Sequence, residues 1–261
     1  MTDLKGLTAL VTGSTSGIGK AAAIALAARG AHVLVVGRDE QRAKDVVAEI
    51  EGSGGSATFR LTTLDDLKSA QDLVEWATKA GDGHVDILVN NAGVPLVGPS
   101  YAATEAEFDE TFGLNVKVPF FLVAALAPAM AERGWGSIVN VSTMVASFGQ
   151  AGMAMYSASR AALELLTKAW AAEYGPRGVR VNAVAPGPTR TRMTKGFPDE
   201  MVNHLAELAP AGRVAEPEEL ATAIAFLASD VAASSTASLL RSTGAEWRRN
   251  SRRRRRLVVK I

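Results

Sequence analysis

The sequence predicts an α/β fold in which one parallel β-sheet carries helices on both faces. Short apolar runs rich in β-branched residues recur along the chain, and each is followed by a segment with helical spacing. In the first unit, strand runs at 7–11 and 32–36 enclose an alanine-rich helix at 20–29, which ends at Gly30. A helix between two strands returns the chain to the same edge of the sheet, so the strands run parallel.

The alternation continues to about residue 184. We expect further helices at 41–51, 67–80, 105–116, 118–133 and 156–174. We expect further strands at 58–61, 86–89, 137–141 and 179–184. A chain of 261 residues with 48% hydrophobic side chains is long enough to bury one sizeable core, so these elements predict a single α/β domain.

The composition excludes several kinds of chemistry. The chain has no cysteine, so disulfides, thiolate nucleophiles and cysteine-ligated metals are ruled out. The three histidines share no metal-ligand spacing, and we predict no metal site. The longest apolar stretch, 118–130, is shorter than the roughly 18 residues that a membrane-spanning helix needs. Since the N-terminus also lacks the pattern of a secretory signal peptide, we expect a cytoplasmic protein.

A glycine-rich segment follows the first predicted strand and opens the first predicted helix. Its glycines, Gly13, Gly17 and Gly19, are spaced G-x3-G-x-G. Such glycines let backbone N–H groups approach a pyrophosphate at the positive end of a helix, and the hydroxyls of residues 14–16 could add donors. An ordinary tight turn is the alternative, but the position between a strand and a helix favours an anion site. The segment therefore predicts a dinucleotide-binding domain.

The residue after the second predicted strand indicates which dinucleotide is bound. NAD-binding domains usually place an acidic residue there, whose carboxylate accepts hydrogen bonds from the ribose. Here the strand runs into Gly37 and Arg38. A guanidinium at that place would pair with the 2′-phosphate of NADP, so Arg38 favours NADP over NAD. A solvated arginine without a ligand is the alternative interpretation.

Three further motifs follow in order, NNAG at 90–93, YxxxR at 156–160 and PGPTRT at 186–191. Together with the glycine-rich segment they resemble the short-chain dehydrogenase/reductase family over residues 5 to about 231, in particular members similar to 3-oxoacyl-carrier-protein reductases and glucose dehydrogenases. The resemblance implies a Rossmann-type sheet of about seven strands and an NAD(P)(H) cofactor. It also implies hydride transfer between the nicotinamide and a carbonyl or secondary-alcohol carbon of a small molecule, and a homo-oligomer.

The resemblance assigns roles to individual residues. Tyr156 matches the tyrosine that exchanges a proton with the substrate oxygen, a task for which a free phenol, with a pKa of about 10, is poorly suited near neutral pH. Thr143, beside Ser142, matches the serine that hydrogen-bonds this oxygen, and Asn115 matches the asparagine that holds a water molecule. The matched cofactor contacts are Gly13, Ser16, Gly17, Ile18, Gly19, Arg38, Asn90, Ala92, Gly93, Tyr156, Arg160, Pro186, Gly187, Thr189 and Thr191.

Two positions depart from the family pattern. Arg160 stands where the family has a lysine four residues after the tyrosine, a spacing that puts both side chains on one helix face. The guanidinium keeps a positive charge that favours tyrosinate, but it is bulkier than an ammonium and does not deprotonate near neutral pH. Thr63 stands where the family has an aspartate near the adenine ring. The departures bear more on turnover than on cofactor binding.

The C-terminal residues differ in composition from the rest. We assign 1–231 to the dinucleotide-binding domain, including its catalytic site, and 232–261 to an arginine-rich tail. Within the domain, 191–210 matches the family's substrate lid, and an ordinary amphipathic surface helix is the alternative. Residues 241–261 contain nine basic residues and one acidic residue. Permitted codons for 234–247, read from the third nucleotide, encode V-D-G-V-A-A-P-V-D-G-G-R-V, which resembles the family's ending. We interpret the tail as the product of a frameshift, which predicts that the last strand is lost or replaced and the sheet edge left unpaired.

Three functions remain open from the sequence. The first is an NADP-preferring oxidoreductase that acts on a carbonyl compound or secondary alcohol. The second is a cofactor-binding protein with little or no catalytic activity, because of Arg160 and the altered C-terminus. The third is a nucleic-acid binder that uses the arginines at 252–256, since a basic cluster attracts phosphates without reading their sequence. We expect a small-molecule substrate and neither a membrane nor a nucleic acid as partner.

Overall fold

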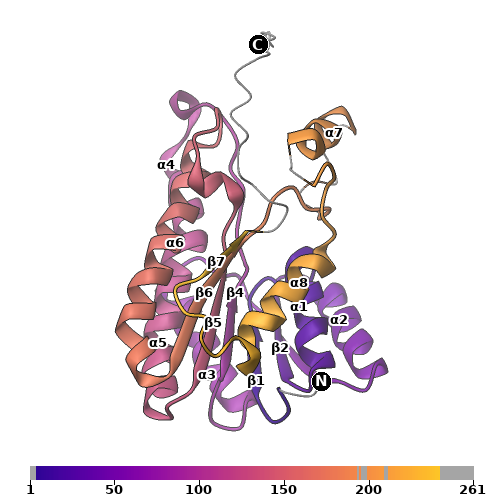
Figure 1. The fold of residues 1–261 in the computed structure, drawn as a ribbon, viewed down its shortest axis with the longest axis vertical. Helices are drawn as coiled ribbons and strands as arrows, with labels where there is room; N and C mark the ends of the chain where they lie inside the picture. Colours follow the sequence, from indigo (N-terminus) through magenta and orange to yellow (C-terminus); the bar gives the residue numbers. More distant parts are fainter. Residues whose placement is uncertain (1–3, 193, 195–198, 209–210, 242–261) are drawn as a thin grey trace.

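A seven-stranded sheet forms the centre of the computed structural model, which describes residues 4–192, 194, 199–208 and 211–241. The strand order is β3-β2-β1-β4-β5-β6-β7, and every neighbouring pair is parallel (Figure 1). The strands are β1 Thr8–Val11, β2 His32–Gly37, β3 Ser56–Leu61, β4 Ile87–Asn90, β5 Gly136–Val141, β6 Val179–Ala185 and β7 Leu239–Arg241. The predicted Rossmann-type parallel sheet of about seven strands is confirmed.

Helices cover both faces of this sheet. The helices α1, α2 and α8 pack against one face, and α3, α5 and α6 pack against the other. The helix bounds are α1 Gly17–Ala28, α2 Glu40–Gly52, α3 Leu67–Ala80, α4 Glu105–Phe112, α5 Val118–Glu132, α6 Ala154–Tyr174, α7 Asp199–Leu208 and α8 Pro217–Ala228. The predicted helices agree with these bounds to within a few residues, except at α4. The helix α7 lies within the segment 191–210 that we expected as a lid, and α8 was not predicted.

Each central strand contributes side chains to two separate cores, because alternate residues of a strand point to opposite faces. In β1, Val11 packs in the cluster with α1 and α8, whereas Leu10 packs in the cluster with α3 and α5. Leu34 and Leu88 lie beside Leu10 in the neighbouring strands, and these three side chains are fully buried, as is Val11. Burial on both faces explains why these strands are continuous apolar runs in the sequence.

The two helices expected at 105–116 and 118–133 form one continuous helical segment. The α-helix α4 passes into five residues of π-helix, η2 Gly113–Lys117, and then into α5. The whole segment, Glu105–Glu132, is long and apolar enough to cross a membrane by length and composition, but half of its apolar window is buried inside the domain. Leu122 is one of the fully buried side chains, so the apolar character is that of a core helix.

A last strand is present, so of the two outcomes that we expected, loss or replacement of this strand, loss is wrong. The strand β7 pairs in parallel with β6, with Leu239 opposite Ala183 and Arg241 opposite Ala185. The folded sheet therefore extends beyond residue 231, where we placed the end of the domain, to Arg241. It is a short edge strand of three residues, and Leu240 is 36% exposed.

The turn that leads into β7 is held by hydrogen bonds but is unfavourable for one residue. The Asn182 side chain accepts the Ser238 N–H at 3.0 Å and donates to the Ser235 carbonyl oxygen at 2.8 Å. The Ala237 N–H donates to the Val181 carbonyl oxygen at 2.9 Å. Ala237 has a φ of +56°, in the left-handed region where a side chain meets the backbone.

Replacing Ala237 by glycine should therefore stabilise the protein. A left-handed backbone costs an alanine about 1 kcal/mol more than a glycine, so we expect Ala237→Gly to raise the free energy of unfolding by about 0.5–1 kcal/mol. Ala233, exposed and with right-handed backbone angles, is the matched control, and Ala233→Gly should not stabilise. Urea unfolding followed by circular dichroism measures both changes. A loss of stability in Ala237→Gly would contradict this description of the turn.

Candidate active site

The predicted site residues come together at the carboxyl edge of the sheet. Most of them lie in the connections that follow β1, β2, β4, β5 and β6, while Asn115 lies in η2 and Tyr156 and Arg160 lie on α6. In Figure 1 this edge is at the upper ends of the strands. Open α/β sheets bind ligands in the crevice at the carboxyl ends of their strands.

The turn between β1 and α1 packs closely against the segment after β4. Gly13 and Gly17 have φ values of +64° and +53°, which favour glycine. A Cβ on Gly13 would lie 3.0 Å from the Cα of Ala92, and a Cβ on Gly19 would overlap the Gly13 carbonyl oxygen and the Asn91 side chain. The glycine spacing thus allows the two segments to touch, as a dinucleotide-binding turn requires.

The N-terminus of α1 has the features of an anion site. Its N-cap residue, Ser16, has an extended backbone and makes no side-chain capping hydrogen bond, and the first turn contains no acidic residue. The backbone N–H groups of 17–19 have no intrahelical acceptor by the geometry of a helix start. These donors and the helix dipole favour a bound anion such as a pyrophosphate.

The hydroxyls of residues 14–16 have different tasks. Ser14 is fully buried, and its Oγ donates to the Val11 carbonyl oxygen at 2.7 Å and accepts the Val36 N–H at 2.8 Å. Ser14 therefore joins the ends of β1 and β2, and our expectation that it could donate to a phosphate is wrong. Thr15 is buried against Gly37, so Ser16 remains as the candidate hydroxyl donor.

Thr12 and Asn91, which the sequence analysis did not single out, join β1 and β4 at this edge. Thr12 Oγ1 accepts the N–H groups of Asn91 and Ala92 at 3.0 and 3.1 Å. Asn91 Nδ2 donates to the carbonyl oxygens of Thr12 and Gly13 at 2.9 and 3.1 Å. Both residues lie next to or inside motifs that we recognised, but the sequence gives no signal of their pairing across 79 positions.

Asn90, predicted as a cofactor contact, directs its side chain into the core. It is 1% exposed, and its Nδ2 donates to Asn140 Oδ1 at 2.8 Å. Asn140 Nδ2 in turn donates to Thr167 Oγ1 at 2.8 Å. The Asn90 side chain therefore connects β4 with β5 and α6 and does not line the crevice.

The segment after β6 lies across the turn between β1 and α1. A Cβ on Gly17 would lie 3.2 Å from the methyl carbon of Thr191, so these two predicted cofactor contacts are neighbours. Thr189 is 5% exposed and donates its hydroxyl to the Gly187 carbonyl oxygen at 3.0 Å. This segment therefore lies beside the N-terminus of α1.

Tyr156 and Arg160 lie one turn apart on α6. The guanidinium carbon of Arg160 is 5.7 Å from the centre of the Tyr156 ring. Arg160 Nη1 donates to the Val141 carbonyl oxygen at 3.0 Å, and Nη2 occupies the space that a Cβ on Gly93 would fill. The structure thus brings the predicted acid/base residue, its neighbouring charge and the NNAG segment into one place.

The positive charge of Arg160 is buried without a carboxylate. The residue is 4% exposed, and among the described residues no Asp or Glu lies within ion-pair distance of it. Its Nε has no hydrogen-bond partner there either. Burying an unpaired charge costs several kcal/mol, so Arg160 is held in the core at an energetic cost that its hydrogen bond to Val141 only partly offsets.

The structure distinguishes the two adjacent hydroxyls after β5. Ser142 is 4% exposed and donates to Glu164 Oε1 at 2.6 Å. Thr143 is half-buried, begins the short helix η3 Met144–Ser147, and makes no side-chain hydrogen bond within the described part of the chain. The N–H of the next residue donates to the Pro186 carbonyl oxygen at 2.9 Å. Thr143 is therefore the hydroxyl that remains available to a substrate.

Asn115 joins the π-helix η2 to Val94 and Ser159 by hydrogen bonds. Its Oδ1 accepts the Val94 N–H at 3.0 Å, and its Nδ2 donates to the Val94 carbonyl oxygen at 3.1 Å and to Ser159 Oγ at 3.0 Å. Ser159 Oγ donates to the Tyr156 carbonyl oxygen at 2.8 Å. Ser159 is a positioning residue that the sequence analysis missed, although it stands inside the YxxxR motif.

Arg38 is exposed directly after β2, and Asp39 beside it is already engaged. The Asp39 carboxylate accepts the Arg42 N–H at 3.0 Å and pairs with Arg42 Nε at 2.9 Å. The backbone hydrogen bond from Arg42 lowers the pKa of Asp39 below its ordinary 3.8, and the charges of Arg42 and Arg192 act in the same direction. Thr63, exposed after β3, makes no contact that would replace the family's aspartate.

Some predicted features lie outside the described residues. These are parts of the expected lid, at 193, 195–198 and 209–210, and the arginine cluster at 252–256. Within the described ranges, no group of three or more His, Cys, Asp or Glu side chains could hold a metal ion.

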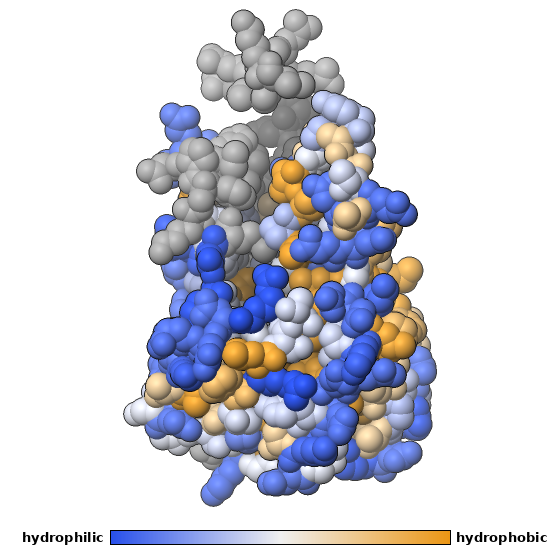
Figure 2. All heavy atoms as spheres, turned by 180° about the vertical axis from the view of Figure 1, so that it is seen from behind, coloured by the Kyte–Doolittle hydropathy of each residue, from blue (hydrophilic) through white to orange (hydrophobic). Residues whose placement is uncertain are grey.

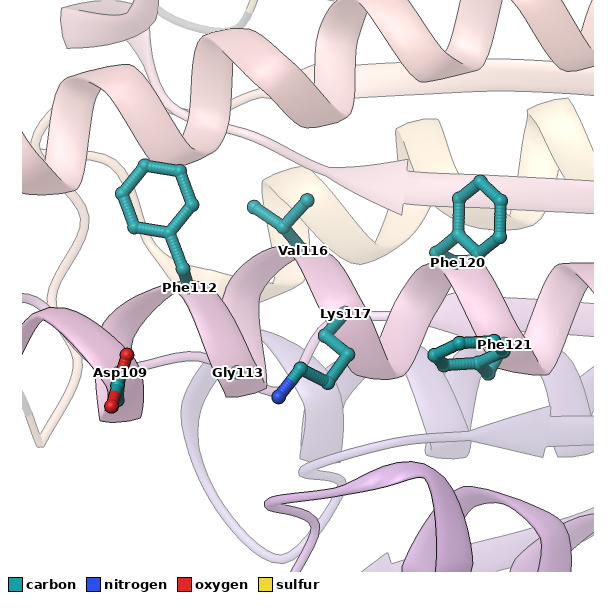
Figure 3. A pocket seen from close by; sticks show the side chains of 7 residues that line it. All are labelled: Asp109, Phe112, Gly113, Val116, Lys117, Phe120 and Phe121. Carbon is teal, nitrogen blue, oxygen red and sulfur yellow. The ribbon is translucent and has the colours of Figure 1, made fainter.

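An open groove of about 300 Å³ lies along α4, η2 and α5. Phe112, Val116 and Phe120 point to one side of this helical segment (Figure 3). None of the residues that we predicted for the site lines the groove.

On the face of the molecule seen in Figure 2, hydrophobic side chains are interspersed with hydrophilic ones.

The contact between Arg160 and Gly93 predicts coupling between these positions. Gly93→Ala should destabilise the protein, because its Cβ would overlap Arg160 Nη2, and the loss should be smaller in the Arg160→Lys background. We expect a coupling free energy of about 1–2 kcal/mol, within the range that contacting residues show. Urea unfolding of the two single variants and the double variant measures it. Additive losses would show that the two side chains do not meet.

Comparisons with known proteins agree with this arrangement. The family described as short chain dehydrogenase matches residues 7–201. The chain is 37% identical to a 3-oxoacyl-[acyl-carrier-protein] reductase of Thermotoga maritima, over 87% of this chain and 92% of that protein. A solved short chain dehydrogenase/reductase family protein is 47% identical with a TM-score of 0.84, over 92% and 96% of the two chains. A 3-oxoacyl (acyl-carrier-protein) reductase from Agrobacterium tumefaciens C58, solved with NADP bound, is 30% identical with a TM-score of 0.89, over 93% and 95%. The chain therefore belongs to the short-chain dehydrogenase/reductase family of NAD(P)-dependent oxidoreductases.

Proposed function

We propose that the chain is an NADP(H)-preferring oxidoreductase that interconverts a carbonyl compound and a secondary alcohol. The observation that carries the proposal is the placement of Tyr156, Arg160 and Thr143 at the same edge as the β1–α1 anion site. This edge offers a group that can exchange a proton, a charge beside it, a free hydroxyl for the substrate oxygen and a place for a pyrophosphate. These are the requirements of carbonyl reduction by a bound nicotinamide.

Groups along this edge would contact successive parts of a dinucleotide. The pyrophosphate would be held by the N-terminus of α1 and the Ser16 hydroxyl, between the glycine turn and Thr191. Tyr156, with the charge of Arg160 beside it, would hold the ribose next to the nicotinamide. When bound, the nicotinamide supplies the hydride to a carbonyl carbon or takes it from an alcohol carbon.

Tyr156 would carry the proton of the reaction. In reduction, its phenolic O–H donates the proton to the substrate oxygen, and in oxidation the tyrosinate takes a proton from the alcohol. The Thr143 hydroxyl donates a hydrogen bond to the same oxygen and so places the reacting carbon. Arg160 places its positive charge beside the phenol ring, with the guanidinium carbon 5.7 Å from the ring centre, in a buried site where Coulomb interactions are stronger than in water. Because a guanidinium keeps its proton, Tyr156 is reprotonated by water and not by Arg160.

The charges after β2 favour NADP over NAD. An NAD-selective site needs a free carboxylate for the ribose hydroxyls, but Asp39 is occupied by Arg42. Arg38 is exposed, and Arg192 is close enough to act on Asp39 electrostatically. The local excess of positive charge attracts a 2′-phosphate.

A second candidate function is cofactor binding with little turnover. The observation behind it is the commitment of Arg160 Nη1 to the Val141 carbonyl oxygen and of Nη2 to the surface of Gly93. These contacts hold the guanidinium in one orientation, so it cannot move with the substrate oxygen. A guanidinium also keeps its proton, so it cannot relay one. The anion site of α1 does not depend on this side chain.

The activity proposal predicts opposite effects of two substitutions on α6. Arg160→Lys should raise kcat at least tenfold, because a compact ammonium can relay a proton that the guanidinium holds. Tyr156→Phe should lower kcat by about 10²–10⁴-fold while NADPH still binds. Absorbance of NADPH with a panel of ketones measures turnover, and NADPH fluorescence measures binding. An unchanged or lower rate in Arg160→Lys would show that arginine serves here, and binding without turnover in every variant would favour the second function.

The NADP preference predicts a selective effect of Arg38. Arg38→Ala should weaken NADPH binding by about tenfold, the loss expected for one charge-assisted contact, and should leave NADH binding nearly unchanged. NADH is the internal control, since it lacks the 2′-phosphate. Equal affinity of the unsubstituted protein for NADPH and NADH, measured by fluorescence titration, would contradict the preference.

A further inference from the structure

The end of β7 brings a positive charge to the carboxyl edge of the sheet. Arg241 pairs in register with Ala185, the last residue of β6, and Pro186 and Gly187 of the predicted site follow directly. Figure 1 shows β7 beside β6 with the same direction. The last described residue of β7 therefore lies beside the segment that begins with Pro186.

Arg241 also contacts the loop that begins with Thr143. Its Nη2 donates to Ser147 Oγ at 2.9 Å, and Ser147 is the last residue of η3. The other end of this loop is held by the segment after β6, through the Met144 N–H and the Pro186 carbonyl oxygen. A 3₁₀ helix rises about 2 Å per residue, so Ser147 lies about 8 Å from Thr143 along the loop.

The charge of Arg241 is not neutralised by the protein. The residue is exposed, and no carboxylate of the described residues lies within ion-pair distance of it. Carboxylates of neighbouring segments already have partners, since Glu164 accepts from Ser142 and Glu216 pairs with Arg190 at 2.9 Å. A guanidinium has five N–H donors, so one hydroxyl contact leaves it able to bind a carboxylate with two parallel hydrogen bonds.

We infer that Arg241 makes the site selective for carbonyl compounds and alcohols that carry a carboxylate, held about 8 Å from the reacting carbon. The inference rests on the proposed function, because it takes Thr143 as the hydroxyl that places the substrate oxygen. With that oxygen at Thr143, a short aliphatic chain along η3 brings a terminal carboxylate to the guanidinium. The position and the charge of Arg241 have this effect whatever the origin of the C-terminal sequence.

Binding of a non-reacting pair of ligands tests the inference without turnover. The full chain, saturated with NADPH, is titrated with hexanoate and with hexanamide, and NADPH fluorescence reports binding. Hexanoate should bind at least tenfold more tightly than hexanamide, and Arg241→Gln should remove the difference. Ser147→Ala is the matched control, because it removes the hydrogen bond but keeps the charge, and it should retain most of the preference. Equal binding of the two ligands by the unsubstituted chain would overturn the inference.

Turnover supplies a readout that separates this inference from the proposed function. With 6-oxoheptanoate and its methyl ester, the carboxylate should be preferred at least tenfold in kcat/KM, mainly through KM, and Arg241→Gln should abolish the preference. Reduction of both ketones without preference would overturn the inference about Arg241 but leave the proposed oxidoreductase activity standing. If no variant reduces either ketone but hexanoate is still preferred through Arg241, the anion site stands and the proposed activity fails. Thermal unfolding of each variant verifies that Arg241→Gln is folded.

Discussion

The hydrogen bonds between the ends of β1 and β4 determine the geometry on which the rest of the site depends. Thr12 and Asn91 exchange side-chain and backbone hydrogen bonds across the two strands, and they draw the glycine turn onto the segment after β4. At this separation Gly13 and Gly19 have no room for a Cβ. The same contact presents Gly93 to α6, where Arg160 lies against it. A parallel sheet brings these segments to one edge, and the two polar side chains set their spacing.

The charge of Arg160 shows how the family's site tolerates an altered residue. A lysine at this position would carry the same sign of charge. Its compact ammonium lacks the planar, forked shape with which a guanidinium can donate to a carbonyl oxygen and pack on a glycine at the same time. Arg160 does both, through Val141 and Gly93, and remains 4% exposed. The positive charge beside Tyr156 is kept, whereas a guanidinium, unlike an ammonium, does not give up a proton near neutral pH. The departure therefore separates two tasks that a lysine performs together.

The edge strand explains how the sheet accepts an unusual C-terminal sequence. Pairing with β6 uses backbone N–H and C=O groups, which every residue but proline provides, so residues 239–241 form β7 although they begin an arginine-rich segment. The side chains make fewer demands there, since Leu240 and Arg241 are exposed. The turn before β7 suits its sequence less well, because Ala237 there has a left-handed backbone conformation that favours glycine. The edge strand therefore restricts the residue types at its positions less than the preceding turn does.

The sequence by itself determined the features that depend on local pattern. Apolar periodicity located the strands and most helices, and the glycine spacing and the YxxxR motif indicated a dinucleotide site with Tyr156 and Arg160 on one helix face. The tertiary structure decided which of several similar groups face the crevice. Ser142 and Asn90 turn into the core because partners distant in sequence, Glu164 and Asn140, receive them. Register of β7 against β6 and the unpaired charge of Arg160 likewise depend on contacts between remote segments, and residue spacing along the chain carries no information about such contacts.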